Sequence, residues 1–180
     1  GKSGESRIAD PGDPTRIFSW LICQSYDDKG NAIVYEYAEE NSDRIFEDDQ
    51  GTQVSLVHER NRTDDTRKAN RYLKTIKYGN RTPNRDANWK ATDPASLQQD
   101  DWMFEVVFDY GEGHYVQDAN QPPPDQHQYV QATMAPTQSW PVRRDSSSGY
   151  RAGFEVRTYR LCRRVLMFHH FPDELGIDDY

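Results

Sequence analysis

The densest group of side chains that could bind a metal or transfer a proton is the segment His169–Glu174, which contains two histidines, an aspartate and a glutamate. His169 and His170 are adjacent, and adjacent side chains on a β-strand point to opposite faces. The ligands of a zinc ion must instead converge on one point. The sequence therefore predicts a strand end with polar tips here, and no metal or acid–base site.

The other acidic and histidine-containing motifs are isolated from groups with which they could do chemistry. They are His58-Glu59, Gly111-Glu112-Gly113-His114, Asp27-Asp28 and Asp64-Asp65. The aspartate pairs suggest calcium, but neither the spacing of an EF-hand nor that of a nonapeptide repeat accompanies them. We expect all of these groups to lie in turns or solvated loops.

Motifs for nucleophilic or phosphate chemistry are missing from the sequence, which contains no G-x-S-x-G, P-loop or G-x-G-x-x-G. The run Ser146-Ser147-Ser148-Gly149 is interpreted as a flexible turn. Four arginines near the end of the chain could hold a phosphate or an ADP-ribose: Arg157, Arg160, Arg163 and Arg164. Strand alternation divides them between two faces, so we expect them to pair with carboxylates of neighbouring strands. The sequence predicts no catalytic, cofactor-binding or metal-binding residue, no cofactor, and hence no enzyme.

Five extended segments must position these groups: residues 16–25, 31–39, 72–78, 102–110 and 154–171. Period-two alternation of aromatic and β-branched residues is typical of a half-buried strand. It is clearest in residues 102–110, where we expect the apolar side chains to pack while Glu105 and Asp109 face water. Residues 154–171 are predicted to form one long strand with a bulge near Arg160, although a helical stripe also fits their second half.

The segment Tyr26–Tyr37 predicts a β-hairpin. Asp27 and Asp28 can accept hydrogen bonds from local backbone amides, and Gly30 can supply the positive φ that a tight turn needs. Alternating apolar residues follow at once. We expect this turn to place Ile22 and Ile33 on neighbouring strands.

Composition limits the kind of protein that this can be. Only 34% of the 180 residues are hydrophobic, whereas the aromatic fraction is 12%, which suits sheets that are wet on at least one face. The net charge of −8 argues against nucleic-acid binding, and no apolar run is long enough to span a membrane. Cys23 and Cys162 are expected to be unpaired.

The organisation predicted from the sequence is a single segment, residues 1–180, with long polar loops at 40–70 and 111–139. Residues 79–101 also have turn chemistry throughout. The opening GKSGESRIADPGDP has neither an initiator Met nor a signal peptide, so we expect a piece from inside a longer protein.

Read in order, four blocks of the sequence resemble the SpvB/TcB-type N-terminal domain of insecticidal toxin complexes. They are RIADPGDPTRIFSWLICQSYDDKGNAIVYEY, NRYLKTIKYGNRTP, WMFEVVFDYGE and YRAGFEVRTYRLCRRVLMFHHFPDE. The hairpin motif YDDKGNAIVYEY is also similar to the YD repeat of Rhs proteins, whose hairpins pave a hollow β-shell. The blocks span nearly the whole chain. Residues 43–57, 113–139 and 144–148 depart from the family pattern.

The resemblance implies an all-β fold of antiparallel strands and hairpins that forms part of a larger β-sheet shell. It implies a structural role in a toxin-complex B component, whose shell, closed with an Rhs-type C component, encloses a cytotoxic polypeptide. The implied partners are the rest of the B chain, the C component and, indirectly, the membrane-penetrating A component, with no nucleic acid and no membrane contact by this segment. Such a protein would be made in the bacterial cytoplasm and then act outside the cell.

Two other functions stay open on the sequence alone. A carbohydrate-binding or adhesive β-domain would stack sugars on aromatic side chains such as Trp89, Trp102 or Trp140, and would need at least two of them on one concave surface. A fragment of an ADP-ribosyltransferase would need a paired-glutamate loop, and the sequence has no E-x-E. If the shell interpretation is right, the excised segment should be marginally stable and should associate through unpaired sheet edges.

Overall fold

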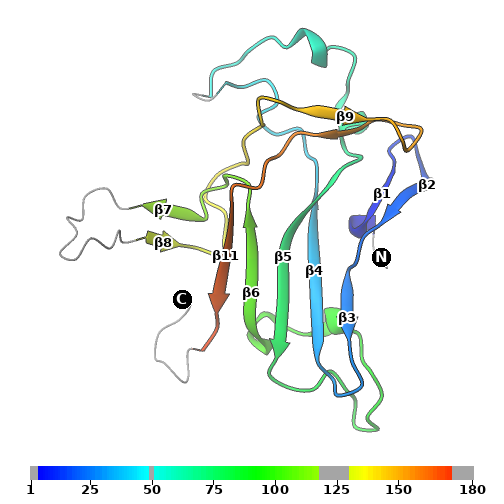
Figure 1. Cartoon of the computed structure of the whole chain (residues 1–180), viewed down its shortest axis with the longest axis vertical. Helices are drawn as coiled ribbons and strands as arrows, with labels where there is room; N and C mark the ends of the chain where they lie inside the picture. The colour runs from blue at the N-terminus through cyan, green and yellow to red at the C-terminus, as the bar shows by residue number, and fades with distance from the viewer. Residues whose placement is uncertain (1–3, 49–50, 118–129, 172–180) are drawn as a thin grey trace, which may run out of the picture.

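The computed structural model of the chain describes residues 4–48, 51–117 and 130–171 (Figure 1). Strands dominate it, and the helical elements are single turns, of which those labelled η are 3-10 helices. In chain order the elements are η1 (Gly4–Ser6), β1 (Arg7–Asp10), β2 (Asp13–Trp20), β3 (Gln24–Tyr26), β4 (Ala32–Glu39), η2 (Val57–Glu59), α1 (Asp64–Arg67), β5 (Arg71–Asn80), η3 (Pro94–Ser96), η4 (Gln99–Asp101), β6 (Trp102–Asp109), β7 (Tyr115–Gln117), β8 (Val130–Ala132), β9 (Ser147–Gly149), β10 (Val156–Thr158) and β11 (Arg164–His169).

The centre of the fold is a five-stranded sheet with the order β11-β6-β5-β4-β3, in which all neighbours are antiparallel. Three two-stranded sheets surround it: β1 with β2, β7 with β8, and β9 with β10. The all-β, antiparallel fold expected from the sequence is confirmed. None of the helices in the described ranges is long and apolar enough to cross a membrane.

Three of the five predicted segments form strands close to their expected limits, namely β4, β5 and β6. The single strand predicted for residues 16–25 is wrong. It is divided into β2, which pairs with β1, and β3, which pairs with β4. The division follows from the two different partners, and Leu21 marks the crossing point, where its amide donates to the carbonyl of Ser6 (2.9 Å).

The long strand predicted for residues 154–171 is also wrong, because it is interrupted between β10 and β11. At the interruption the side chains of Tyr159 and Arg160 are both buried. They contact Glu59 and Glu40, which lie in the loop before β5. The chain leaves the strand conformation where these two residues reach partners outside the sheet.

The hairpin predicted around Gly30 is confirmed, because Gly30 has φ +90° and Ser25 of β3 lies opposite Ile33 of β4. The Asp27 carboxylate accepts hydrogen bonds from the amides of Lys29 (3.0 Å) and Asn31 (2.9 Å). The expected position of Ile22 is wrong. Ile22 precedes β3, and its carbonyl accepts a hydrogen bond from the Tyr37 hydroxyl (2.9 Å).

Replacing Gly30 with valine should destabilise the protein by at least about 1 kcal/mol, because a β-branched residue fits positive φ poorly. A Cβ atom at Gly30 would also lie 2.8 Å from the Cβ of Pro83. Urea unfolding measures the effect. The matched control is Gly51→Val, since Gly51 has φ +79° but open space around it. Equal losses for the two variants would contradict the close contact with Pro83.

The main apolar cluster lies at one end of the sheet, where Tyr72, Tyr110 and Trp140 are buried against one another. Their ring centroids are 5.3–6.0 Å apart in edge-to-face arrangements. Such pairs stabilise by about 0.5–1.5 kcal/mol beyond the area that they bury. Burial raises the pKa of Tyr72 to about 12, although its hydroxyl accepts a hydrogen bond from the Tyr159 amide. The cluster therefore joins β5 and the end of β6 to the chain that precedes β9.

Candidate functional site: an open sheet face and buried ion pairs

The two adjacent histidines point to opposite faces of the sheet, as the sequence predicted for neighbouring strand residues. The His169 ring packs edge-on against Phe104, with centroids 5.4 Å apart. His170 is buried on the other side, where its Nε2 lies 3.5 Å from a carboxylate oxygen of Glu105. Asp173 and Glu174 lie outside the described residues. In the described part of the chain, no cluster of three or more His, Cys, Asp or Glu residues could hold a metal ion.

The expectation that Glu105 and Asp109 face water is wrong, because both side chains are buried. Asp109 accepts hydrogen bonds from the amides of Gly111 (2.7 Å) and Glu112 (2.9 Å) and from Arg164 (3.3 Å). Burial alone would raise the pKa of Asp109, but these hydrogen bonds hold it below its usual value. Glu105 accepts a hydrogen bond from Gln99 of η4 (2.6 Å).

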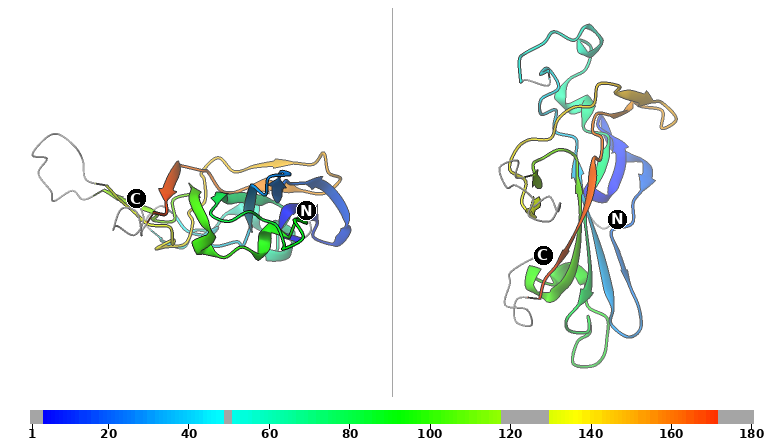
Figure 2. Two further views of the ribbon diagram at one scale, coloured as in Figure 1. Left: turned by 90° about the horizontal axis from the view of Figure 1, so that it is seen from below. Right: turned by 60° about the vertical axis from the view of Figure 1, so that its left-hand side comes forward.

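The face that carries Glu105 is covered by the segment between β5 and β6. η3 contacts β4, and a cleft between them is lined by Val34, Glu36 and Ala95. In the right-hand view of Figure 2, the green coil of residues 94–101 lies on one side of the lower half of the sheet. Sequence alternation distinguished the two faces of β6 but could not reveal that a loop covers the charged one.

The opposite face of the sheet is only partly covered in the described part of the chain, since its side chains are half-buried in the central strands and exposed at Met167 of β11. It is built from two rows of directly opposed residues, which we call the open face: Tyr35, Ile76, Val106 and Met167 in the first row, and Ile33, Tyr78, Phe104 and His169 in the second. Directly opposed residues of antiparallel strands share one face. None of these side chains is fully buried, and Met167 is 54% exposed.

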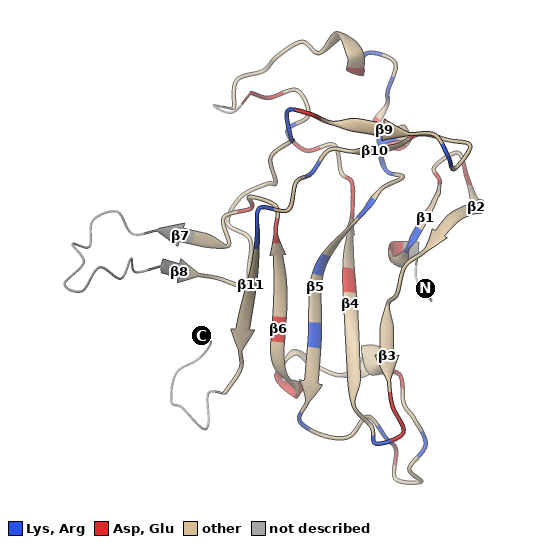
Figure 3. Ribbon diagram, viewed as in Figure 1, with Lys and Arg blue, Asp and Glu red and all other residues tan. Residues whose placement is uncertain are grey.

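The open face has no Asp, Glu, Lys or Arg in its two rows. The charged side chains that alternate with them are Glu36, Lys77 and Glu105, which belong to the covered face. Red and blue bands in Figure 3 mark charged positions along β4, β5 and β6. Lys77 and Glu36 form an ion pair there (3.0 Å). The sheet thus buries part of its charged face and leaves the two uncharged rows only partly covered, the reverse of the arrangement expected for a sheet exposed to water on one side.

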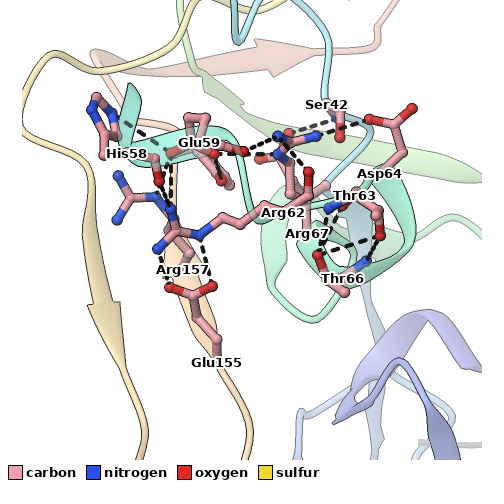
Figure 4. Close-up of polar contacts among 12 residues, drawn as sticks. Ser42, His58, Glu59, Arg62, Thr63, Asp64, Thr66, Arg67, Glu155 and Arg157 are labelled. Atoms are coloured by element: carbon pink, nitrogen blue, oxygen red, sulfur yellow. Dashed lines mark hydrogen bonds and ion pairs between the residues drawn. The ribbon is translucent and has the colours of Figure 1, made fainter. Parts of the chain in front are cut away.

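The second notable feature is a buried carboxylate, Glu59, which lies among three arginines (Figure 4). The side chain of Glu59 is 1% exposed, and its oxygens lie 3.5 Å from Arg62, 3.4 Å from Arg67 and 3.2 Å from Arg157. The Tyr159 hydroxyl donates to it (2.7 Å). Burial and this acceptor raise the pKa of Tyr159. The sequence interpretation of Glu59 as a solvated loop residue is wrong, because its partners Arg157 and Tyr159 come from the other end of the chain.

Glu155 extends this network towards the surface. Its two oxygens accept hydrogen bonds from Arg62 at 2.6 Å and 2.7 Å, and further ones from Ser148 (2.6 Å) and Tyr150 (2.9 Å). The hydrogen bonds from Arg62, followed by those from the two hydroxyls, lower the pKa of Glu155 to about 2. Ser148 itself lies in strand β9, so the flexible turn expected for residues 146–149 is wrong.

Glu155 should make stability depend on pH between about 4.5 and about 2. Its folded-state pKa is depressed, so its contribution is complete above pH 4.5 and is lost as the pH falls through 2. The loss should be on the order of 2 kcal/mol. Acid unfolding of Glu155→Gln and of the parent protein measures it as a difference in slope. The control is Asp145→Asn, since Asp145 pairs with Arg143 but is 76% exposed. An unchanged slope for Glu155→Gln would contradict the assignment.

A second buried ion pair joins Arg160 to Glu40, and both side chains are 0% exposed. The guanidinium of Arg160 also donates to the carbonyls of Trp140 (2.7 Å) and Asp43 (3.0 Å) and lies over the Trp140 ring, 4.7 Å from its centroid. Glu40 in turn accepts hydrogen bonds from the amides of Asn41 and Ser42, both at 3.1 Å. This pair therefore fixes the start of the loop after β4 to the chain between β10 and β11.

The remaining acidic, histidine and arginine residues singled out in the sequence make structural contacts or are exposed. Glu112 and His114 were expected to be solvated but are buried: Glu112 pairs with Lys74, and the His114 Nδ1–H donates to the Thr133 carbonyl (2.9 Å). Asp64 and Asp65 are exposed at the start of α1. Of the four arginines near the chain end, only Arg164 pairs with a carboxylate of a neighbouring strand, Asp109 of β6, as expected. Arg157 and Arg160 pair instead with Glu59 and Glu40, which lie outside the strands, so the expected cross-strand pairing is wrong for these two.

A cleft of 630 Å³ opens beside Glu59, and its lining includes Arg62, Arg143 and Arg157. Each of these arginines already pairs with a carboxylate.

The aromatic residues proposed for sugar stacking do not gather on one surface either. Trp102 and Trp140 are buried, and only Trp89 of the three is exposed. Arg62, Arg143 and Arg157 thus serve ion pairs within the protein, and the three tryptophans do not form the surface that sugar stacking needs.

Comparison with known proteins finds a matching family and a similar relative. Residues 1–171 match the family described as SpvB, Salmonella virulence plasmid 65kDa B protein. The chain is 39% identical over 180 residues to the mono(ADP-ribosyl)transferase SpvB of Salmonella typhimurium (strain 14028s / SGSC 2262), and the match covers 99% of this chain and 26% of that protein. The chain thus spans about a quarter of the length of this relative.

Two solved structures are similar over the whole chain. The N-terminal domain of effector protein SpvB from Salmonella typhimurium strain LT2 has a TM-score of 0.73 and 38% identity, and the match covers 100% of this chain and 48% of that one. TcdB2-TccC3-TEV has a TM-score of 0.73 and 33% identity, and the match covers 100% of this chain and 7% of that one.

Proposed function

Because this chain belongs to the SpvB family of the Salmonella virulence plasmid 65kDa B protein, we propose that it is a structural, non-catalytic β-segment of a bacterial toxin-complex B component. In this role it helps to build a hollow shell that encloses a cytotoxic polypeptide. The observation that carries the proposal is the similarity of the whole chain to TcdB2-TccC3-TEV at a TM-score of 0.73. A shell segment needs rigid strands and firmly attached loops, which the buried ion pairs provide.

The proposal assigns no catalysis to this segment, although the relative is named a mono(ADP-ribosyl)transferase. This chain is similar to the N-terminal domain of that protein and spans 26% of its length. We therefore place any transferase activity in another part of such a protein. The arrangement of Glu59, Glu40 and their arginines supports this division, since these groups are buried in ion pairs with one another.

The proposed partners follow from the same assignment. They are the rest of the B-component chain and an Rhs-type C component, with the A component contacted indirectly. Contact with nucleic acid or with a membrane is not part of the role. The protein would be made in the bacterial cytoplasm and would act extracellularly as part of the toxin complex.

Two measurements on the full-length protein test the proposal. Electron cryomicroscopy of its complex with the C component should show the five-stranded sheet within the shell wall, and a sheet that projects free of the wall would contradict the structural role. The full-length protein should also keep any NAD turnover when residues of this segment are substituted. Reproducible turnover that is abolished by changing one residue of this segment would overturn the non-catalytic assignment.

A further inference from the structure

The open face is an unusual surface for a sheet in contact with water. Its two rows hold eight side chains from four strands, and none of them is an Asp, Glu, Lys or Arg. The aromatic rings already pack in the plane of the face: Tyr78 is stacked on Phe104, with centroids 5.1 Å apart. Contiguous apolar surfaces of this kind mark sites that another surface covers.

The exposure is greatest at the edge strand β11. Val165 and Met167 are 60% and 54% exposed, and Val165 lies opposite Phe108, beside the two rows. Among the described strands, none pairs with the outer edge of β11. Both the edge of the sheet and the adjoining part of the open face are therefore available to a further layer.

One aromatic side chain after β11 already packs on the open face. Phe171 follows β11 and packs edge-on against Phe104 of the open face, with ring centroids 5.6 Å apart. The guanidinium of Arg81 lies 5.8 Å from the centre of the Phe171 ring. Phe171 therefore covers part of the open face beside Phe104.

We infer that the open face is an internal packing surface, covered in the intact protein by the part of the same domain that lies beyond residues 1–180. The N-terminal domain of SpvB matches this chain along 100% of its length but is covered by it for only 48%. About as much chain again thus belongs to that domain. The five-stranded sheet then becomes a middle layer, with the segment carrying η3 and η4 on its charged face and the rest of the domain on its uncharged face.

This inference rests on membership of the family and is independent of the shell function. It also specifies what covers the open face, namely the rest of the same domain. A second copy of the chain or the C component would bind only when that molecule is present, whereas a layer from the same domain covers the face in every state of the folded protein. The distinction can be measured as the accessibility of a single thiol.

The experiment uses the full-length protein, in which Cys23→Ala and Cys162→Ser remove the two unpaired cysteines of this segment and any cysteine elsewhere in the protein is replaced by serine. A thiol is then introduced on the open face by Met167→Cys, and in a second protein by Val165→Cys. The control is Val57→Cys, since Val57 is 70% exposed on η2, away from the sheet. Each protein is labelled with a maleimide at low and high concentration, with and without the C component.

We expect the thiols of the Met167→Cys and Val165→Cys variants to react at least about tenfold more slowly than that of the Val57→Cys variant under all conditions, and to react fully after denaturation. Equal reactivity in the full-length protein alone would overturn the inference. Protection that appears only at high concentration would indicate a second copy, and protection only with the C component would indicate that partner. Either result would overturn the inference while leaving the shell function to be tested by microscopy.

Discussion

Replacing Arg160 with methionine should destabilise the protein by about 3–5 kcal/mol, because it leaves the carboxylate of Glu40 buried without its partner. Both side chains are inaccessible to water, so solvent cannot replace the lost charge. The carbonyls of Trp140 and Asp43 would lose a donor as well. Chemical unfolding in urea, compared with the parent protein, measures the loss.

The residue next to Glu40, Glu39, provides a matched control. Glu39 pairs with Arg71 at 2.8 Å but is 48% exposed, so Glu39→Gln should cost less than about 1 kcal/mol. Glu40→Gln should cost several times more. The double variant Arg160→Met with Glu40→Leu should recover part of the loss, since it removes both buried charges. If Arg160→Met costs no more than Glu39→Gln, the buried pair does not hold the loop after β4 in place.

The parts of the fold that depend on local sequence could be predicted. Alternation located β4, β5 and β6, and the turn chemistry of Asp27 and Gly30 located the hairpin. These features depend on residues within a few positions of one another, which is where propensity and periodicity act. The order of the four sequence blocks also indicated the family, which comparison with known proteins confirms.

The parts that depend on distant partners could not be predicted. Glu59 and Tyr159 are separated by 100 residues, and Glu40 and Arg160 by 120. Each residue looks like an ordinary polar loop or strand position in its own neighbourhood. The same limit explains the errors at β6, because Glu105 and Asp109 alternate correctly but are covered by segments that alternation does not describe.

The low apolar content of the chain is reflected in its small apolar cluster. With 34% hydrophobic residues, the apolar cluster of Tyr72, Tyr110 and Trp140 holds only one end of the sheet. The loop after β4 is attached instead through Glu40 and Glu59, whose charges are neutralised by arginines from other segments. The sheet's own buried carboxylates, Glu105 and Asp109, lie on the face opposite the two uncharged rows, which leaves those rows for the further layer inferred for the open face.

The charge of Glu59 should therefore matter as much as that of Glu40. Glu59→Gln should destabilise the protein by about 3–5 kcal/mol, because Arg67 and Arg157 would be left largely buried beside a neutral side chain. Arg67 is only 3% exposed, and Arg157 is 11% exposed. The amide oxygen of glutamine can still accept the hydrogen bond from Tyr159, so the loss reports on charge and not on that hydrogen bond.

Two further variants distinguish the effect of the Glu59 charge on stability from the effects of the groups around it. Tyr159→Phe removes only the hydroxyl and should cost about 1–2 kcal/mol. Asp64→Asn removes the other carboxylate that pairs with Arg67, but Asp64 is 76% exposed, so the loss should stay below about 1 kcal/mol. Unfolding in urea ranks the three variants. If Glu59→Gln costs no more than Asp64→Asn, the arginines around Glu59 do not depend on its charge, and the loop before β5 must be held by other contacts.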